Sequence, residues 1–162
     1  AVVEAAGRLR GNTVTYVNVG ARGEGRGFHW VYFPEPQFPF YRAGSFSAAH
    51  RPLAPEGCQS FYVEFAHRGG LSPRVAEQQA VEGLLRAGLI EEGQLLFAEA
   101  REVPDAYVLY DADYRGARGA VLDFLEHAGI LTAGRYGRWE YSSMEDAILA
   151  GREAAGRLAA VR

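Results

Sequence analysis

The chain has 162 residues, 48% of them hydrophobic, with a formal net charge of -3. This length suits one domain of ordinary size with a buried core, which excludes intrinsic disorder, and the small negative charge argues against general attraction to nucleic acid or a membrane surface. No apolar run is long enough to span a bilayer, and the single cysteine, Cys58, excludes an internal disulfide and fits a cytoplasmic location.

The first half of the chain is predicted to be mainly strands. Apolar residues at helical spacing near the start indicate a short helix, and alternating β-branched and aromatic residues indicate strands further on. The expected elements, in chain order, are a helix at 1–9, a strand at 13–19, a glycine-rich loop at 20–27, a strand at 28–33, an aromatic run at 38–46, a turn-rich loop at 47–57 and a strand at 59–67.

Helices and strands alternate in the second half. Ser72 and Pro73 are typical of a helix start, and Gly88 and Gly129 of helix ends. The expected elements are a helix at 73–87, extended runs at 95–103 and 107–110, a helix at 115–128, a short apolar strand at 130–133 and a last helix from about 143. This order predicts an α+β fold, with a mostly antiparallel, aromatic-rich sheet, helices on one face and a C-terminal strand–helix unit.

The start of the last helix is the most informative segment. Two pairs, Ser142 with Glu145 and Ser143 with Asp146, have the spacing of a capping box. A helix N-terminus presents free N–H groups and a partial positive charge, which suit an anionic group of a ligand. A well-capped structural helix is the simpler interpretation. Gly151 in mid-helix costs about 1 kcal/mol against alanine, which predicts close packing against its backbone.

Other side chains offer less specific chemistry. The histidines at 29, 50, 67 and 127 are scattered without metal-ligand spacing, so no metal site is expected. Asp111 and Asp113 could act as an acid and a base, although a solvated turn is the better interpretation. Arg42, in the aromatic run, could bind a ligand, with a snorkelling or salt-bridged arginine of the sheet as the alternative. Aromatic side chains near it could line a cavity or belong to the core; they are Trp30, Tyr32, Phe40 and Tyr41.

The segment 134–147, GRYGRWEYSSMEDA, resembles the C-terminal FAD-contacting segment of the flavin amine oxidase and protoporphyrinogen oxidase superfamily, which has UDP-galactopyranose mutase-like relatives. Upstream runs resemble the substrate-domain half of such proteins, and they are 29–35, 39–42, 103–107 and 110–111. The resemblance covers nearly the whole chain.

The resemblance implies an FAD cofactor, and it assigns substrate binding and cofactor binding to different parts of the chain. Residues 1–129 would belong to a substrate-binding domain, and residues 130–162 would be the return segment of an FAD-binding domain. The implied cofactor contacts are Gly134, Arg135 and the backbone N–H groups of Met144, Glu145 and Asp146, facing the flavin. The implied substrate-side residues are Arg42, Trp30 and Tyr41, in contact with a small molecule.

One part of the pattern is missing. The Gly-x-Gly-x-x-Gly turn that binds the dinucleotide does not occur, since the glycines at 20, 23, 25 and 27 have other spacing and precede a strand. The chain also opens without Met, in mid-element. We therefore expect the C-terminal portion of an FAD-dependent oxidoreductase, inactive by itself and with weak or no FAD binding.

Two alternatives stay open, a mutase-like flavoenzyme that isomerises a sugar nucleotide and a stand-alone, non-catalytic binding domain. An uncovered surface around Ile130, Leu131, Tyr136 and Trp139 would favour a homodimer.

Overall fold

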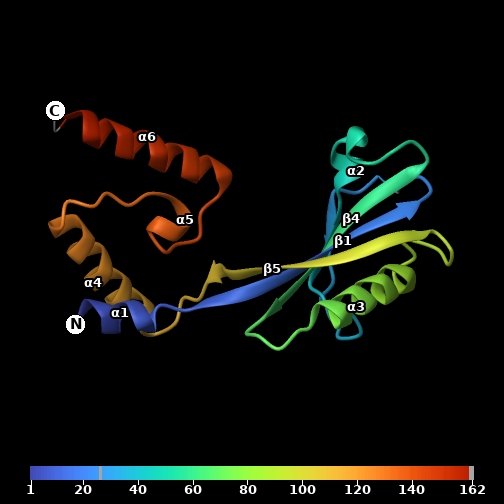
Figure 1. Cartoon of the computed structure of the whole chain (residues 1–162), viewed down its shortest axis with the longest axis horizontal. Helices are drawn as coiled ribbons and strands as arrows, with labels where there is room; N and C mark the ends of the chain where they lie inside the picture. The colour runs from blue at the N-terminus through green and yellow to red at the C-terminus, as the bar shows by residue number, and fades with distance from the viewer. Residues whose placement is uncertain (26, 161–162) are drawn as a thin grey trace. The chain divides into compact units, whose positions relative to one another are not determined.

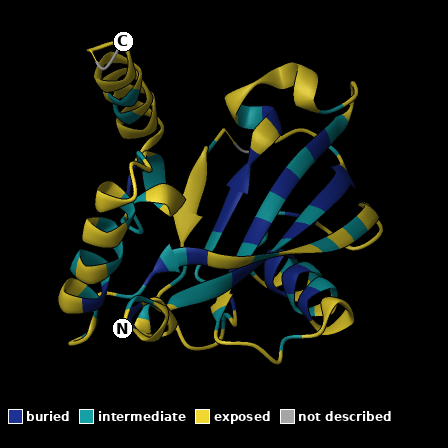
Figure 2. Ribbon diagram, turned by 60° about the vertical axis from the view of Figure 1, so that its left-hand side comes forward, coloured by how far each residue is buried: buried dark blue, intermediate teal, exposed yellow. Residues whose placement is uncertain are grey.

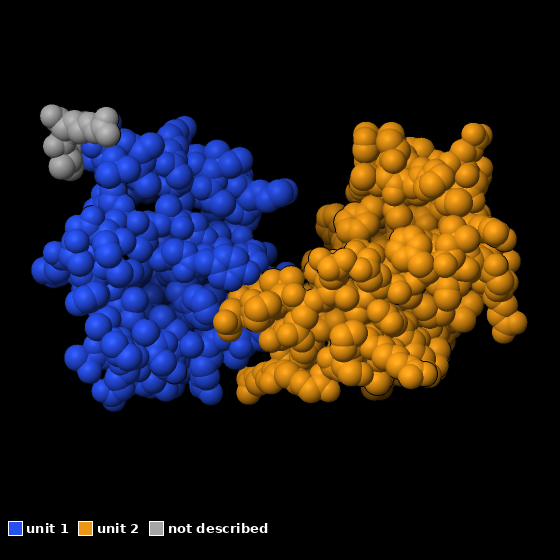
Figure 3. Space-filling model, in the orientation of Figure 1, with its two compact units in different colours: residues 1–12, 107–162 blue, residues 13–106 orange. Residues whose placement is uncertain are grey.

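The computed structural model describes residues 1–25 and 27–160. The chain divides into two compact units, coloured separately in Figure 3: residues 1–12 with 107–162, and residues 13–106. In chain order the elements are α1 (Val2–Arg8), β1 (Gly11–Arg22), β2 (Trp30–Tyr32), β3 (Arg42–Ser45), α2 (Phe46–Ala49), the 3-10 helix η1 (Arg51–Leu53), β4 (Cys58–His67), α3 (Pro73–Arg86), β5 (Leu95–Val108), α4 (Tyr114–His127), α5 (Gly134–Gly137) and α6 (Met144–Ala160). The predicted boundary at residue 129 separates a substrate-binding part from the return segment of an FAD-binding domain, and it stays a prediction.

The strands form one sheet in the order β2-β3-β4-β1-β5 (Figure 1). The pairs β2–β3, β3–β4 and β1–β4 are antiparallel. Hydrogen bonds from Arg22 N to Gln94 O at one end, and from Leu109 N to Arg10 O at the other, give β5 the antiparallel sense beside β1. The predicted α+β fold with a mostly antiparallel sheet is therefore confirmed.

The core of the unit 13–106 lies between the sheet and α3. Alternate residues along β4 point to this side and are buried, whereas β1 also has consecutive buried residues (Figure 2). The core cluster includes Val17, Val63, Phe65 and Leu84. A Cβ on Gly83 of α3 would overlap the Phe40 ring, so the glycine lets that ring reach the helix backbone.

The opposite face of this sheet is aromatic and open. A Cβ on Gly44 would overlap the Tyr62 ring, and one on Gly20 would overlap the Phe97 ring. Both glycines therefore allow an aromatic ring to approach the backbone of the sheet closely. The Phe46 ring at the start of α2 packs on Tyr62, with 4.8 Å between the ring centroids.

The unit 1–12 with 107–162 has a much smaller core. Its buried residues include Ala5, Val108, Ala117 and Ser142, whereas α6 has no buried residue among those described. Figure 2 accordingly shows α6 largely in the colour of exposed residues, whereas α4 is mixed. The predicted close packing against Gly151 is absent within the described part of the chain, because nothing lies within 4 Å of a Cβ built there.

Several predicted elements need correction. Residues 130–133 form no strand: they pair with no strand of the described chain, and the Ile130 N–H donates to the Leu125 carbonyl at the end of α4. The strand expected at 28–33 is limited to Trp30–Tyr32, and the loop at 47–57 contains α2 and η1. The two extended runs at 95–103 and 107–110 belong mostly to the single strand β5, which tolerates Pro104 at the edge of the sheet.

Candidate functional site

The open sheet face brings an arginine and a glutamate together across two strands. The β3–β4 register places Arg42 directly opposite Glu64. Arg42 Nε donates to Glu64 Oε2 at 2.6 Å, and the Tyr41 hydroxyl donates to the same oxygen, also at 2.6 Å. Both charged side chains are largely buried, with exposed fractions of 22% and 16%. The alternative of a salt-bridged Arg42 therefore describes the observed geometry.

Aromatic rings surround the Arg42 guanidinium. Its central carbon lies 5.7 Å from the centroid of the Tyr32 ring and 5.6 Å from that of Tyr41. Burial alone would lower the pKa of Arg42, but hydrogen bonding to Tyr32 and the attraction of Glu64 raise it above its ordinary value. Arg42 thus keeps its proton, and its charge is balanced by Glu64.

Of the predicted substrate-side residues, the structure joins Arg42 and Tyr41 through Glu64. Trp30 is on the same sheet face as Arg42. In the β2–β3 register Trp30 pairs with Gly44, and Tyr32, two residues further on, pairs with Arg42. Trp30 is 54% exposed and takes no part in the ion pair between Arg42 and Glu64. Glu64 was not predicted as a site residue. Its place opposite Arg42 depends on strand register, which the sequence pattern alone does not give.

An apolar groove lies on the same unit, at the end of the sheet that carries α2. It has a volume of about 430 Å³ and is lined mainly by Phe46, Leu53 and Phe97. Its one charged lining residue, Glu99, is paired with Arg101. The groove is therefore suited to uncharged groups.

The predicted cofactor segment is built differently from a simple strand and turn. Gly134 has φ +72°, the left-handed region that favours glycine, and it begins the single helical turn α5. The capping box of α6 uses Ser143 and Asp146. Asp146 N donates to Ser143 Oγ at 3.1 Å, and Ser143 N donates to Asp146 Oδ2 at 2.8 Å. The box of Ser142 with Glu145, the first of the two predicted pairs, is not formed, since the Ser142 hydroxyl has no partner in the described part of the chain.

This cap commits one of the three backbone donors predicted to face a cofactor. The N–H of Asp146 is used by Ser143, whereas the N–H groups of Met144 and Glu145 belong to the first turn and have no intrahelical acceptor. The hydrogen bonds from Ser143, chiefly from its backbone N–H, hold the pKa of Asp146 below its ordinary value of 3.8. Two carboxylates, Glu145 and Asp146, therefore stand in the first turn of α6.

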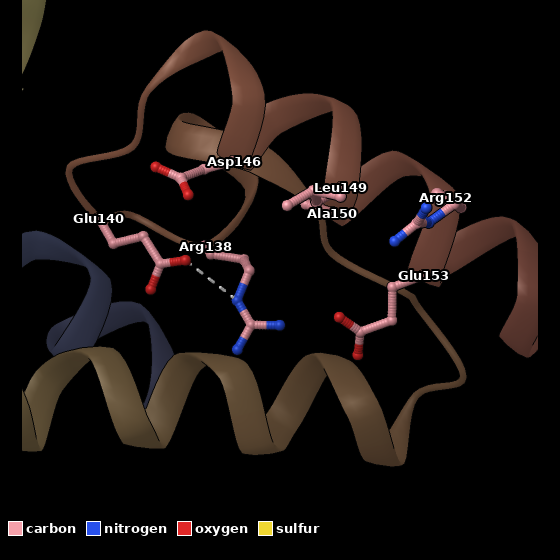
Figure 4. Close-up of a pocket in the computed structure, with 7 residues that line it drawn as sticks. All are labelled: Arg138, Glu140, Asp146, Leu149, Ala150, Arg152 and Glu153. Atoms are coloured by element: carbon pink, nitrogen blue, oxygen red, sulfur yellow. Dashed lines mark ion pairs between the residues drawn. The ribbon is translucent and has the colours of Figure 1, made fainter.

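A hollow of about 550 Å³ lies along α6. Figure 4 shows the seven side chains that line it, and Arg138 and Glu140 form an ion pair at one end, 3.4 Å apart. Three carboxylates face two guanidinium groups here; the lining residues are Arg138, Glu140, Asp146, Leu149, Ala150, Arg152 and Glu153. Glu140 is also paired with Arg118, so the charges around the hollow balance and leave no positive excess to attract a phosphate.

The remaining candidates are structural. Asp111 Oδ1 accepts the N–H groups of Asp113 and Tyr114 at 3.0 Å each, and Asp111 Oδ2 pairs with Arg10. The Arg10 guanidinium is the main cause that holds the pKa of Asp111 below its ordinary value of 3.8. Asp111 thus orders the turn before α4, as its interpretation as a turn residue predicts.

Residues 1–25 and 27–160 offer neither a metal site nor a membrane-spanning helix. No three His, Cys, Asp or Glu side chains in this part of the chain gather closely enough to hold a metal ion. No helix formed by these residues combines the length and the apolar character needed to cross a membrane.

Solved structures share this fold. The crystal structure of a reduced UDP-galactopyranose mutase matches 98% of the chain with a TM-score of 0.89 and 21% identity. That of a candidate protoporphyrinogen oxidase from Exiguobacterium sp. 255-15 matches 100% with a TM-score of 0.70 and 12% identity. The chain spans 36% and 37% of these two proteins. No family model and no curated protein matches the sequence. At such identities the likeness establishes the fold.

Proposed function

We propose that the chain is the C-terminal portion of an FAD-dependent oxidoreductase and supplies part of the substrate pocket and one edge of the flavin site. The observation that carries this proposal is the TM-score of 0.89 over 98% of the chain with a protein almost three times as long. The motif at 134–147 supports it independently, because it is the segment whose sequence resembles a flavin-contacting one.

On the substrate side, the open sheet face offers Trp30, Tyr41 and Arg42. Because Arg42 is neutralised by Glu64, we assign it the role of ordering the rings of Tyr32 and Tyr41, while the exposed Trp30 makes direct contact with a ligand. The nearby groove lined by Phe46 and Leu53 would hold an uncharged part of the same small molecule.

On the cofactor side, the start of α6 fits a carbonyl edge. The N–H groups of Met144 and Glu145 can donate to the flavin N1–C2=O edge, and the Ser142 hydroxyl, 8% exposed, is buried without a partner in the described part of the chain. The carboxylates of Glu145 and Asp146 disfavour a phosphate at this place. Gly134 allows the backbone to turn beside the ring, and Arg135 lies one residue further on. The flavin, when bound, supplies the electron-transfer chemistry.

A second candidate is a mutase-like activity, in which reduced flavin supports isomerisation of a sugar nucleotide without net oxidation. It is favoured by the higher TM-score to the mutase, 0.89 against 0.70. Product analysis with the natural polypeptide separates the two. A reduced acceptor or hydrogen peroxide supports the oxidoreductase, and a changed sugar ring form supports the mutase.

The decisive experiment is expression of the natural polypeptide that contains this chain. We expect it to carry a Gly-x-Gly-x-x-Gly segment and to retain flavin absorbance after desalting. The 162-residue chain expressed alone should lose flavin on desalting. A natural polypeptide that begins at Ala1 and binds no flavin would favour the stand-alone binding domain instead. A yellow preparation of the short chain would contradict the expected weak binding.

A further inference from the structure

Side chains of α4 bind the backbone of the turn that leads into α6. We call this turn, residues 138–142, the α6 turn. Arg118 Nε donates to the carbonyl oxygen of Arg138 at 2.6 Å, and the Tyr114 hydroxyl donates to the carbonyl oxygen of Trp139 at 2.9 Å. Burial raises the pKa of Tyr114, which keeps this hydroxyl protonated as a donor.

The second part of the α6 turn is held by Tyr110 and Arg135. The Tyr110 hydroxyl accepts the N–H of Tyr141 at 2.7 Å. Arg135 Nη2 donates to the carbonyl oxygen of Ser142 at 2.8 Å, and the Arg135 carbonyl accepts the N–H of Glu140 at 3.0 Å. Every residue of the turn therefore has a backbone group bound to Tyr110, Tyr114, Arg118 or Arg135.

The Arg135 guanidinium is also held by two aromatic rings. Its central carbon lies 5.2 Å from the Tyr107 ring centroid and 5.1 Å from that of Tyr141. The two rings are nearly parallel, at 15°. A planar guanidinium can use its face for such rings and its edge for the Ser142 carbonyl at the same time, which an ammonium cannot do.

The α6 turn contains a backbone conformation that needs such support. Trp139 has φ +48°, one of two non-glycine residues with positive φ in the described chain. Bulky residues adopt this region only where surrounding contacts over-determine the backbone. The Tyr114 hydroxyl, which donates to the Trp139 carbonyl, and the Tyr110 hydroxyl, which accepts the N–H of Tyr141 two residues further on, supply that support.

We propose that Arg135 and Tyr110 are positioning residues that fix the α6 turn and thereby the direction of the first N–H groups of α6. The edge offered to a ligand is then formed by this chain before any ligand binds. Arg135 acts through the turn, because its guanidinium is engaged by Ser142 and by two rings. The consequence for a flavin rests on the proposed function, whereas the rigidity of the turn does not.

Amide hydrogen exchange of the 162-residue chain tests the rigidity. Tyr110→Phe removes only the acceptor oxygen, and we expect exchange at Tyr141 to become about tenfold faster. Arg135→Lys keeps the charge but removes the planar fork, and we expect it to loosen the turn as much as Arg135→Gln does. Tyr136→Phe is the matched control, since Tyr136 is 56% exposed and makes none of these bonds.

Exchange at Val63 in the central strand β4 serves as the folding control. Acceleration confined to residues 139–144 supports the proposal. Wild-type exchange in Tyr110→Phe, or full rescue by Arg135→Lys, would overturn it, and so would equal acceleration at Val63.

The functional consequence is measured in the natural, flavin-containing polypeptide. We expect the flavin reduction potential to shift in Tyr110→Phe and Arg135→Lys and to stay unchanged in Arg74→Lys, a change at an exposed position of α3 in the other unit. If the turn loosens in the short chain while the potential stays constant, the flavin contact of the proposed function is wrong and the positioning role stands. If the turn does not loosen, the positioning role fails whatever the potential does.

Discussion

At the scale of single residues, the open sheet face is ordered by one ion pair. Glu64 Oε2 accepts hydrogen bonds from both Arg42 and Tyr41, so a single oxygen binds a guanidinium and a phenol hydroxyl. Because the pair is largely buried, removing one partner leaves a charge without compensation in a medium that solvates it poorly. The pair therefore contributes more through the order it gives to Tyr32 and Tyr41 than through charge offered to a ligand.

We expect Arg42→Met to lower the free energy of unfolding by about 1.5–3 kcal/mol, since Glu64 loses a charge-assisted hydrogen bond. The double variant Arg42→Met with Glu64→Gln should recover part of this loss, because no buried charge remains. Urea unfolding measures both. The control is Arg101→Met on the exposed pair with Glu99, expected to cost less than about 1 kcal/mol. Equal losses at Arg42 and Arg101 would contradict the structural role.

A second residue-scale prediction concerns helix glycines. Gly83→Ala adds a methyl group where the Phe40 ring already lies, so overpacking should cost about 1–3 kcal/mol despite the better helix propensity of alanine. Gly116→Ala in α4 makes the same chemical change where nothing lies within 4 Å, and it should stabilise by about 0.5–1 kcal/mol. Thermal unfolding of the two variants should thus move in opposite directions. A stabilised Gly83→Ala would show that Phe40 does not need this approach.

At the scale of elements, the N-terminus of α6 depends on its capping box. Ser143→Ala removes the acceptor for Asp146 N–H and should cost about 1 kcal/mol of helix stability. The pKa of Asp146 is lower in the folded chain than its ordinary value of 3.8, so the cap contributes stability above that value and loses it as the pH falls through the folded pKa.

Circular dichroism between pH 5 and 2 should therefore show fraying of α6 at the acid end, in wild type but much less in Asp146→Asn. Arg10 lowers the pKa of Asp111 in the same way. The variant Asp111→Asn is therefore measured as well, to separate the effect of Asp111 from that of Asp146. If the wild type and both variants gave identical acid profiles, neither carboxylate would be the cause of the fraying of α6.

Elements with a strong local pattern were predictable, and those that depend on distant partners were not. Ser72, Pro73 and an apolar stripe predict the helix at 73–87, and alternation predicts the strand at 59–67; both differ from the observed elements by one residue at one end. Residues 130–133 are as apolar as a strand but have no neighbour to pair with. The site shows the same limit, since Arg42 stood out in its aromatic run while Glu64 became visible only through the β3–β4 register.

At the scale of the whole molecule, apolar surface is left uncovered on the unit that contains α6. Ile130 and Tyr136 of the predicted association surface are 52% and 56% exposed, whereas Leu131 and Trp139 are half-buried. The helix α6 adds Met144 at 87% and Ile148 at 72%. The fold neighbours are almost three times as long as this chain, so much of their length has no counterpart here. Apolar surface of this kind tends to be covered by another part of the protein or by a second copy.

We expect the 162-residue chain to self-associate through this surface and α6, because α6 has no buried residue in the described chain and exposes several apolar side chains. Ile148→Glu places a charge in the middle of the exposed apolar residues and should raise the dissociation constant at least about tenfold, since burying an unpaired charge is strongly unfavourable. Sedimentation equilibrium over a concentration series measures it.

The matched control is Val3→Glu in α1, which changes an equally apolar residue at 84% exposure outside the predicted surface and should leave association unchanged. In the natural, longer polypeptide the same Ile148→Glu change should act on stability, since we expect the remaining part of that protein to cover α6. A short chain that stays monomeric at millimolar concentration would contradict the association surface. A longer protein unaffected by Ile148→Glu would contradict the covered helix, and with it the view of α6 as the returning element of a larger domain.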